Sequence, residues 1–357
     1  MPNYLKFQYV SLEKPTLPIH DDLQNTFLEY AVQDPTLRVE LQVLPMSARY
    51  RVIRFLHAVD QAQASSHFDP AHTTLKLMVA PEFFFRDDTT LDSYQDVTLV
   101  TQIYATLLRA LSTPQYKDWL FIPGSVFWHS LINGVPHYFN TTLIINGGGH
   151  QVAPGQGRTA QGIRVVGAGV TTQKALMSRI DYAVGLDKTA QDGALNELFK
   201  PIIGDLEWRR DHVFSPYGKS DSQGNPLLVG VETCLEHVQS TQGAQIGLIK
   251  DVERELQSLG QHLPPLHFQV VSSCGMRLNP ASLHIRPNNA YALLCDGAGG
   301  GTTGCTTVLY GAVNPIQYNT EPLPPLAVKT LKAPGLVPLN LPATFNTELK
   351  IYKPEPL

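Results

Sequence analysis

The sequence predicts an α/β protein in which helices cover sheets of buried strands. Apolar, β-rich runs alternate along the chain with amphipathic stretches whose apolar residues recur at helical spacing. Hydrophobic residues make up 43% of the 357 residues and charged residues only 16%. This composition excludes a disordered chain and provides for a large core.

The alternation defines the predicted elements in order. In the first half we expect a strand over residues 38–44, a helix over 47–64, a strand over 75–85 that breaks at Pro81, a helix over 92–111, and strands over 119–127 and 138–146. In the second half we expect strands over 226–231, 268–272 and 290–295, with a helix over 244–259. Strands and helices that alternate in this way are typical of sheets covered by helices.

The two ends of the chain lack these patterns. Residues 1–35 contain no clear helical or strand periodicity, and residues 313–357 are rich in proline. We therefore expect an N-terminal extension over 1–35, one domain over 36–312, and a Pro-rich arm over 313–357.

Charge, cysteine content and hydropathy argue against a nucleic-acid-binding protein, a membrane protein and a metalloprotein. The 27 Lys and Arg residues nearly balance 31 Asp and Glu residues, so no basic field predicts binding to nucleic acid or to a membrane. No apolar run approaches the roughly 20 residues that span a bilayer, and no signal peptide is evident. The four cysteines form no CxxC pair and the histidines show no metal spacing. We expect a cytoplasmic protein without metal or cofactor, and its low charge favours a homodimer or larger oligomer.

Glu82 is the first candidate for chemistry. It follows the apolar run LKLMVAP and precedes three phenylalanines at 83–85. A carboxylate among aromatic side chains is partly desolvated, which suits a general base or acid. The alternative is a strand-end glutamate that makes only a local backbone contact.

Cys234 is the second candidate, at the end of the strand-like run LLVGVET. Strand ends in α/β folds bring side chains to a cleft, and a following helix N-terminus would favour the thiolate and direct N–H groups at an oxyanion. The alternative is a buried core cysteine, the usual place of a free thiol. Cys274 remains a rival nucleophile. His237 is only one turn away from Cys234, whereas Cys–His pairs generally take the histidine from a distant segment.

Lys174, in TTQKALMSRIDY, is the third candidate, although a lone lysine is ordinarily a solvated surface residue. The order of these motifs resembles the nitrilase, or carbon–nitrogen hydrolase, superfamily, with its Glu–Lys–Cys triad. VELQVLP resembles the opening strand, FIPGSVF the strand that enters a Gly-Ser turn, and YFNTTLIINGGGH the asparagine strand with its glycine turn. CLEH at 234–237 is similar to the nucleophile signature of true nitrilases, in which an aromatic residue replaces Leu235. The resemblance covers residues 38–309.

The resemblance implies a four-layer α-β-β-α sandwich and hydrolysis of a nitrile or amide of a small molecule by Glu82, Lys174 and Cys234, without metal or organic cofactor. Acyl transfer to an amine, or a catalytically silent interaction module, are alternatives on the same fold. Lys188 is a rival for the lysine, because the segment around Lys174 lacks the Lys-x-His wording of the family. Many members add a second structural glutamate, for which the candidates are Asp181, Glu197 and Glu207.

Overall fold

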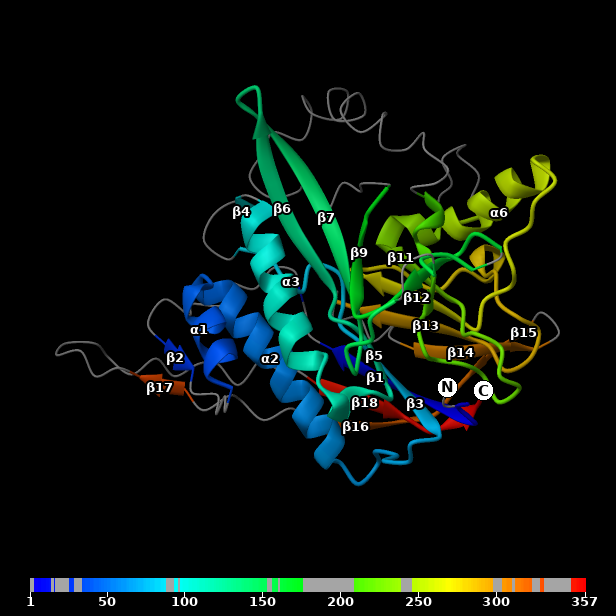
Figure 1. The fold of residues 1–357 in the computed structure, drawn as a ribbon, viewed down its shortest axis with the longest axis horizontal. Coiled ribbons are helices and arrows are strands. Elements are labelled where there is room, and N and C mark those ends of the chain that lie inside the picture. Colours follow the sequence, from blue (N-terminus) through cyan, green and yellow to red (C-terminus); the bar gives the residue numbers. More distant parts are fainter. Residues whose placement is uncertain are drawn as a thin grey trace.

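The structure is a computed structural model of the chain, and the strands that it describes form three sheets (Figure 1). It describes residues 3–13, 16, 26–28, 34–87, 93–95, 97–152, 156–159, 161–175, 209–238, 246–297, 304–309, 312–322, 328–330 and 348–357. Within these ranges the strands form a ten-stranded sheet, a seven-stranded sheet and a separate two-stranded sheet of β2 (Thr26–Leu28) and β17 (Val328–Thr330).

The first sheet is built around parallel strands. Its order is β16 (Tyr318–Pro322), β18 (Glu348–Tyr352), β1 (Lys6–Glu13), β3 (Thr74–Val79), β5 (Trp119–Ile122), β7 (Val135–Asn146), β6 (Ser125–Ile132) and β4 (Tyr94–Gln95). In addition, β19 (Glu355–Pro356) pairs with β1, and β9 (Gly169–Gln173) pairs with β7. Strands β1, β3 and β5 run parallel, so the residues that follow β3 and β5 meet at one edge of the sheet.

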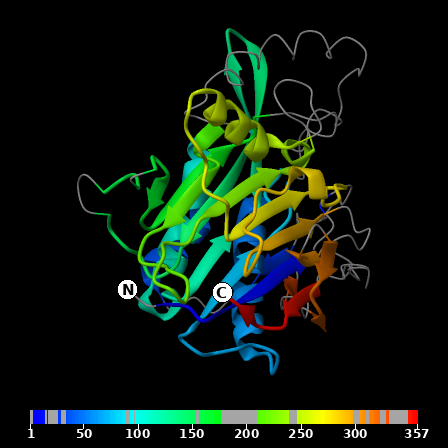
Figure 2. The same cartoon turned by 90° about the vertical axis from the view of Figure 1, so that its right-hand side faces the viewer.

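The second sheet has the order β15 (Ala312–Pro315), β14 (Gly304–Leu309), β13 (Tyr291–Asp296), β12 (Phe268–Ser273), β11 (Val229–Thr233), β10 (Val213–Pro216) and β8 (Arg164–Val166). Its central strands β11, β12 and β13 are parallel. The turned view in Figure 2 shows the two sheets stacked, with the yellow and orange strands of the second sheet over the blue strands of the first.

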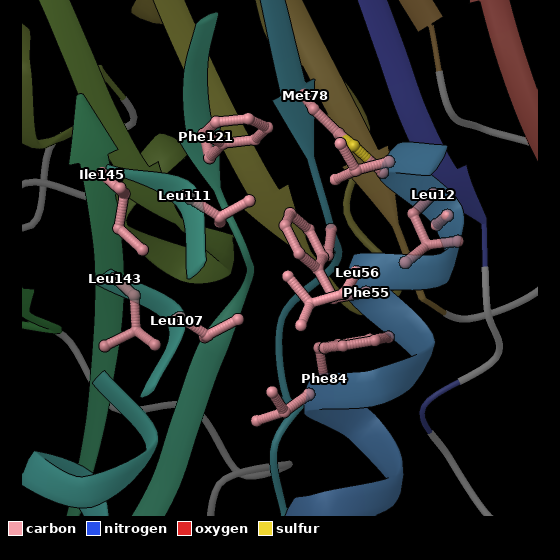
Figure 3. Packing of buried hydrophobic residues seen from close by; sticks show 14 of the residues in the cluster. Leu12, Phe55, Leu56, Met78, Phe84, Leu107, Leu111, Phe121, Leu143 and Ile145 are labelled. Atoms are coloured by element: carbon pink, nitrogen blue, oxygen red, sulfur yellow. The ribbon is translucent and has the colours of Figure 1, made fainter. Parts of the chain in front are cut away.

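The two sheets and the helices form four layers. Helices α1 (Pro35–Val43), α2 (Met46–Ala64) and α3 (Val97–Leu111) cover the outer face of the first sheet, and α6 (Leu248–Ser258) covers the second (Figure 1). One apolar cluster joins α2 and α3 to the first sheet (Figure 3), a second fills the space between the sheets, and a third lies under α6. The predicted four-layer α-β-β-α sandwich is confirmed.

Alternating side chains explain why each central strand has two buried faces. Along β5, Trp119 and Phe121 join the cluster under the helices, whereas Leu120 and Ile122 face the second sheet. The helices predicted over 47–64, 92–111 and 244–259 are confirmed as α2, α3 and α6. The predicted strands correspond to β3, β5 with β6, β7, β11, β12 and β13.

The strand predicted over 38–44 is wrong, because this segment is part of helix α1. The Asp34 carboxylate caps the helix by accepting hydrogen bonds from the amides of Thr36 and Leu37, and a proline occupies its first turn. Leu37 and Leu41, four residues apart, are the side chains that the helix buries. Alternating apolar residues therefore misled the strand prediction, and VELQVLP is not the opening strand.

The expected irregular ends are also wrong where the structure describes them. Strand β1 pairs with β3 inside the first sheet, and the C-terminal strand β18 pairs with β1 on its other side. Phe7 and Tyr9 face the second sheet, while Val10 and Leu12 face the helices. The polar residues of β1 interrupt its apolar pattern, and its register with Ile351 joins positions more than 300 residues apart, which local patterns do not reveal.

A cluster of buried ionisable groups lies at the opposite edge of the first sheet from the residues that follow β3. Lys219 is 2% exposed and donates a hydrogen bond to the carbonyl oxygen of Lys117 at 2.5 Å. Asp118 accepts a hydrogen bond from the hydroxyl of Tyr4 at 3.2 Å and pairs with His72 Nδ1 at 2.6 Å. Burial lowers the pKa of Lys219 to about 7; the charge of Asp118 opposes this shift and that of Lys76 adds to it.

This pKa predicts that folding stability rises with pH above neutrality. Between pH 7 and 10 the unfolded chain retains the Lys219 proton and the folded chain has released it, so the free energy of unfolding increases by at most about 1.4 kcal/mol per pH unit. Lys219→Met should flatten this dependence and stabilise the protein most near pH 7. Urea unfolding of both proteins at pH 7 and pH 9 measures the difference, and parallel shifts in the two proteins would contradict the prediction.

Candidate active site

Glu82 lies directly beyond β3, where a tight turn turns the chain away from the sheet. Strand β3 ends at Val79, Pro81 follows two residues later, and Phe83 adopts a left-handed backbone with φ of 58°. The amide of Phe83 donates a hydrogen bond to Ser125 Oγ at 3.0 Å, so the Gly-Ser turn between β5 and β6 holds this conformation. Gly124 has φ of +85°, and a Cβ there would lie 2.4 Å from the Pro81 carbonyl oxygen. The two turns therefore position Glu82 by close backbone contact.

The carboxylate of Glu82 contacts two side chains through the same oxygen. Asn140 Nδ2 donates to Oε1 at 2.9 Å, and Lys174 Nζ donates to it at 2.7 Å. The Glu82 and Lys174 side chains are both 0% exposed. The structure thus brings together two residues that are 92 positions apart in the sequence.

Strand pairing explains how Lys174 reaches Glu82. Strands β7 and β9 are antiparallel, with Thr141 opposite Gln173, so Lys174 emerges beside Asn140. The amide of Lys174 donates to the Asn140 carbonyl oxygen at 2.9 Å, which extends the ladder by one residue. Asn140 therefore holds the backbone of Lys174 and the carboxylate of Glu82 at once.

The environment of this ion pair is apolar. Lys174 Nζ lies 5.9 Å from the centre of the Phe83 ring, which packs edge-on against Phe127. A buried ion pair depends on both partners, because removing one leaves an uncompensated charge out of water at a cost of about 3–5 kcal/mol. The Lys174 ammonium and the Glu82 carboxylate are therefore expected to stay in contact with each other.

Cys234 begins a short 3-10 helix, Cys234–His237, at the end of β11; we refer to these four residues as the Cys234 turn. Cys234 is 2% exposed and has φ of 51°, a left-handed conformation that a residue with a side chain adopts only under constraint. The side chain of the preceding Thr233 is hydrogen bonded to Thr142 of β7, Oγ1 to Oγ1, at 2.8 Å. This contact joins the nucleophile candidate's strand to the sheet that carries Asn140.

Glu236 links the Cys234 turn to the segment of Lys174. One carboxylate oxygen accepts from the amide of Thr233 at 2.7 Å, and the other accepts from the amide of Ala175 at 2.5 Å. Burial raises the pKa of Glu236, while His212, the two amides and Lys174 oppose this shift. A single fully buried carboxylate therefore ties the residue after Lys174 to the residue before Cys234.

The sequence prediction missed the roles of Asn140 and Glu236. The signal for Glu236 is Thr233-Cys-Leu-Glu, the pattern of a capping box, and the structure contains both hydrogen bonds of that box. The earlier candidates for a structural acid, Asp181, Glu197 and Glu207, lie outside the described residues, as does Lys188.

The rival thiols differ from Cys234 in their surroundings. Burial raises the pKa of Cys274 to about 12, with the charge of Glu82 adding to the shift against a hydrogen bond from Thr16. Burial also raises the pKa of Cys295 well above its ordinary value. Both groups are therefore held as thiols near neutral pH, which disfavours them as nucleophiles.

His237 is not available as a base for Cys234. Its Nδ1 lies 2.6 Å from Glu232 Oε2, and its Nε2 accepts a hydrogen bond from the amide of Asn279 at 2.9 Å. Because both ring nitrogens are engaged away from the thiol, the geometry does not support a Cys234–His237 pair.

The described residues hold no group of three or more His, Cys, Asp or Glu side chains arranged to bind a metal ion. Among the same residues, none of the helices combines the length and the apolar character that crossing a bilayer requires.

Comparisons with known proteins give structural matches only. No family model and no curated protein sequence matches the chain. Nit3 of Saccharomyces cerevisiae, a member of branch 10 of the nitrilase superfamily, matches with a TM-score of 0.37 at 12% identity over 100% of this chain and 92% of its own. A glutamine-dependent NAD(+) synthetase from Cytophaga hutchinsonii matches with a TM-score of 0.31 at 11% identity, over 76% of this chain and 31% of its own.

The architecture of the chain itself agrees with the fold that the sequence motifs imply. Two sheets pack face to face between outer helices, and β3, β9 and β11 end directly before or close to Glu82, Lys174 and Cys234. The chain therefore has the four-layer α-β-β-α sandwich that the resemblance of its motifs implies.

Proposed function

We propose that the chain is a hydrolase that cleaves a non-peptide C–N bond, in a nitrile or an amide of a small molecule, through a thioester on Cys234. The observation that carries this proposal is the buried ion pair of Lys174 and Glu82, fixed by Asn140 and joined through Glu236 to the Cys234 turn. In this proposal the pair supplies a proton acceptor and a cation to the constrained cysteine, which are the parts that nucleophilic acyl chemistry requires.

In the first half-reaction with an amide, Cys234 Sγ attacks the carbonyl carbon as Glu82 accepts the thiol proton. The ammonium of Lys174 and the amide after Cys234 stabilise the negative charge that develops on oxygen. Glu82 then delivers the proton to the nitrogen as the C–N bond breaks, so that ammonia or an amine leaves and a thioester remains.

In the second half-reaction, the water oxygen attacks the thioester carbon as Glu82 takes a proton from that water. The thiolate of Cys234 then leaves, and Glu82 returns the proton to it. A nitrile would follow the same route with one additional water, because the thioimidate must be hydrated before ammonia leaves. The steps use the side chains of Glu82, Lys174 and Cys234, the backbone amide after Cys234, and water.

A substrate screen measures this function directly. Nitriles, primary amides and N-carbamoyl compounds are incubated with the protein, and released ammonia is quantified. We expect release from at least one class, and the responding class distinguishes nitrile from amide hydrolysis. Acyl transfer would instead consume the substrate only when an amine acceptor is added, with the acyl product detected by mass spectrometry.

Thiol labelling separates an enzyme from a silent fold member. A reactive Cys234 should be alkylated by iodoacetamide at pH 7 far faster than the other three cysteines, Cys274, Cys295 and Cys305. Burial holds two of these, Cys274 and Cys295, as thiols by raising their pKa. Equal, slow labelling of all four cysteines together with no ammonia release would favour an interaction module.

Assembly is a further expectation. We predict a homodimer or larger oligomer, because the charged fraction of 16% leaves much apolar surface for an interface. Exposed Val39 and Val43 on α1 are consistent with such a surface. Sedimentation at micromolar concentration should give a mass above 39.4 kDa, and a monomer alone would contradict the prediction.

A further inference from the structure

We propose that His237 and Glu232 form a positioning pair that holds Cys234 in its reactive, left-handed conformation. The pair brackets the cysteine: Glu232 lies two residues before it on β11, and His237 ends the Cys234 turn three residues after it. This inference rests on the proposed role of Cys234, and it assigns His237 a role other than the base considered from the sequence.

The hydrogen bonds of His237 define its protonation. The amide of Asn279 can only donate, so His237 Nε2 accepts and carries no proton. The proton of the neutral ring is therefore on Nδ1, which donates to Glu232 Oε2 at 2.6 Å. The side chains of both partners are 0% exposed, so water does not compete for this bond.

Glu232 is anchored on the outer face of the second sheet. Gln269 Nε2 on β12 donates to its Oε2 at 2.8 Å, and the amide of Ile249 in the first turn of α6 donates to its Oε1 at 3.0 Å. Helix α6 approaches so closely that a Cβ at Gly247, where φ is +76°, would lie 3.0 Å from Glu232 Oε1. The carboxylate therefore has its position set by β12 and α6, and His237 is bound to a fixed point.

The consequence for Cys234 follows from chain geometry. The Glu232–His237 bond closes a six-residue loop around a residue with φ of 51°. Glu236 ties the same turn to the Lys174 segment, and Thr233 ties it to β7. Because left-handed backbone is unfavourable for a side-chain-bearing residue, it persists only where such contacts over-determine it. Without the His237 bond, the turn is free to relax and to change the position of the thiol.

Two substitutions at one position separate the bonds of His237. In His237→Asn the amide nitrogen occupies the place of Nδ1 and retains the bond to Glu232. In His237→Gln the amide group reaches the place of Nε2, retains the Asn279 contact and loses the bond to Glu232. We expect His237→Gln to lower kcat for ammonia release at least tenfold with KM within about threefold, and His237→Asn to recover most of that loss.

Alkylation of Cys234 by iodoacetamide, followed by mass spectrometry of its peptide, gives a readout that does not need a substrate. The labelling rate should fall in His237→Gln and recover in His237→Asn. His262→Gln is the matched control, since His262 is exposed and pairs with Glu253 away from the Cys234 turn.

The outcomes distinguish this inference from the proposed function. Unchanged kcat and labelling in His237→Gln, or recovery by glutamine and not by asparagine, would overturn the positioning role. A lowered melting temperature with unchanged labelling would also overturn it, because it would show a purely structural role. If no substrate releases ammonia while labelling follows the expected pattern, the positioning role stands and the proposed hydrolysis fails.

Discussion

Cys234→Ala is expected to abolish turnover and to leave the fold intact. The thiol supplies the atom that forms the thioester, and no other described side chain at the Cys234 turn is a nucleophile of comparable strength. The substitution removes one sulfur atom and leaves the hydrogen bonds of Thr233, Glu236 and His237 in place. Ammonia release measures activity, and circular dichroism with thermal unfolding measures the fold.

Cys274→Ala is the control for this experiment. Cys274 is buried beside Thr16, so its loss should reduce stability while the rate stays within a few-fold of the parent. Full activity in Cys234→Ala would end the thioester hypothesis, whichever result Cys274→Ala gives.

Lys174→Ala is expected to lower kcat by at least a hundredfold. Loss of a preorganised donor to the charge of the transition state costs on the order of 3 kcal/mol. Lys188→Ala is expected to stay within a few-fold, because its sequence neighbours are typical of an exposed loop. Steady-state kinetics of the two variants measure the difference. If Lys188→Ala loses activity and Lys174→Ala does not, the proposed triad would still hold, with Lys188 as its lysine.

The buried ion pair adds a stability effect that must be separated from catalysis. Lys174→Ala leaves the Glu82 carboxylate buried without its cation, at a cost of about 3–5 kcal/mol of folding stability. Adding Glu82→Gln removes that charge, so the double variant should be more stable than Lys174→Ala alone and still inactive. Urea unfolding and kinetics of Lys174→Ala, Glu82→Gln and the double variant test this. Equal stability of Lys174→Ala and the double variant would contradict the buried pairing.

Local pattern was sufficient for several central elements, but strands β8, β9, β10 and β14 were not predicted. Helix α2 and strands β5, β12 and β13 carry long apolar runs or helical periodicity, and their predicted places agree with the structure. Segment 38–44 failed because alternating apolar residues also suit a short amphipathic helix, which the Asp34 cap and a proline in the first turn select. Strand β1 was missed because its partner β18 lies at the far end of the chain.

The sequence by itself determined which residue types stand at the ends of strands: a glutamate beyond β3, a lysine beyond β9 and a cysteine beyond β11. Order and residue type are local properties, and they were enough to predict an α/β fold. The four-layer sandwich and the candidate triad came from the resemblance of the ordered motifs to the nitrilase superfamily. Only the tertiary structure decided that Lys174 reaches Glu82, because that contact depends on the register of β7 with β9. The same holds for Asn140, Glu236 and the His237–Glu232 pair. Their hydrogen bonds join separate strands and helices, and a bond across 61 residues, such as that of Glu236 to Ala175, leaves no periodic trace in the chain.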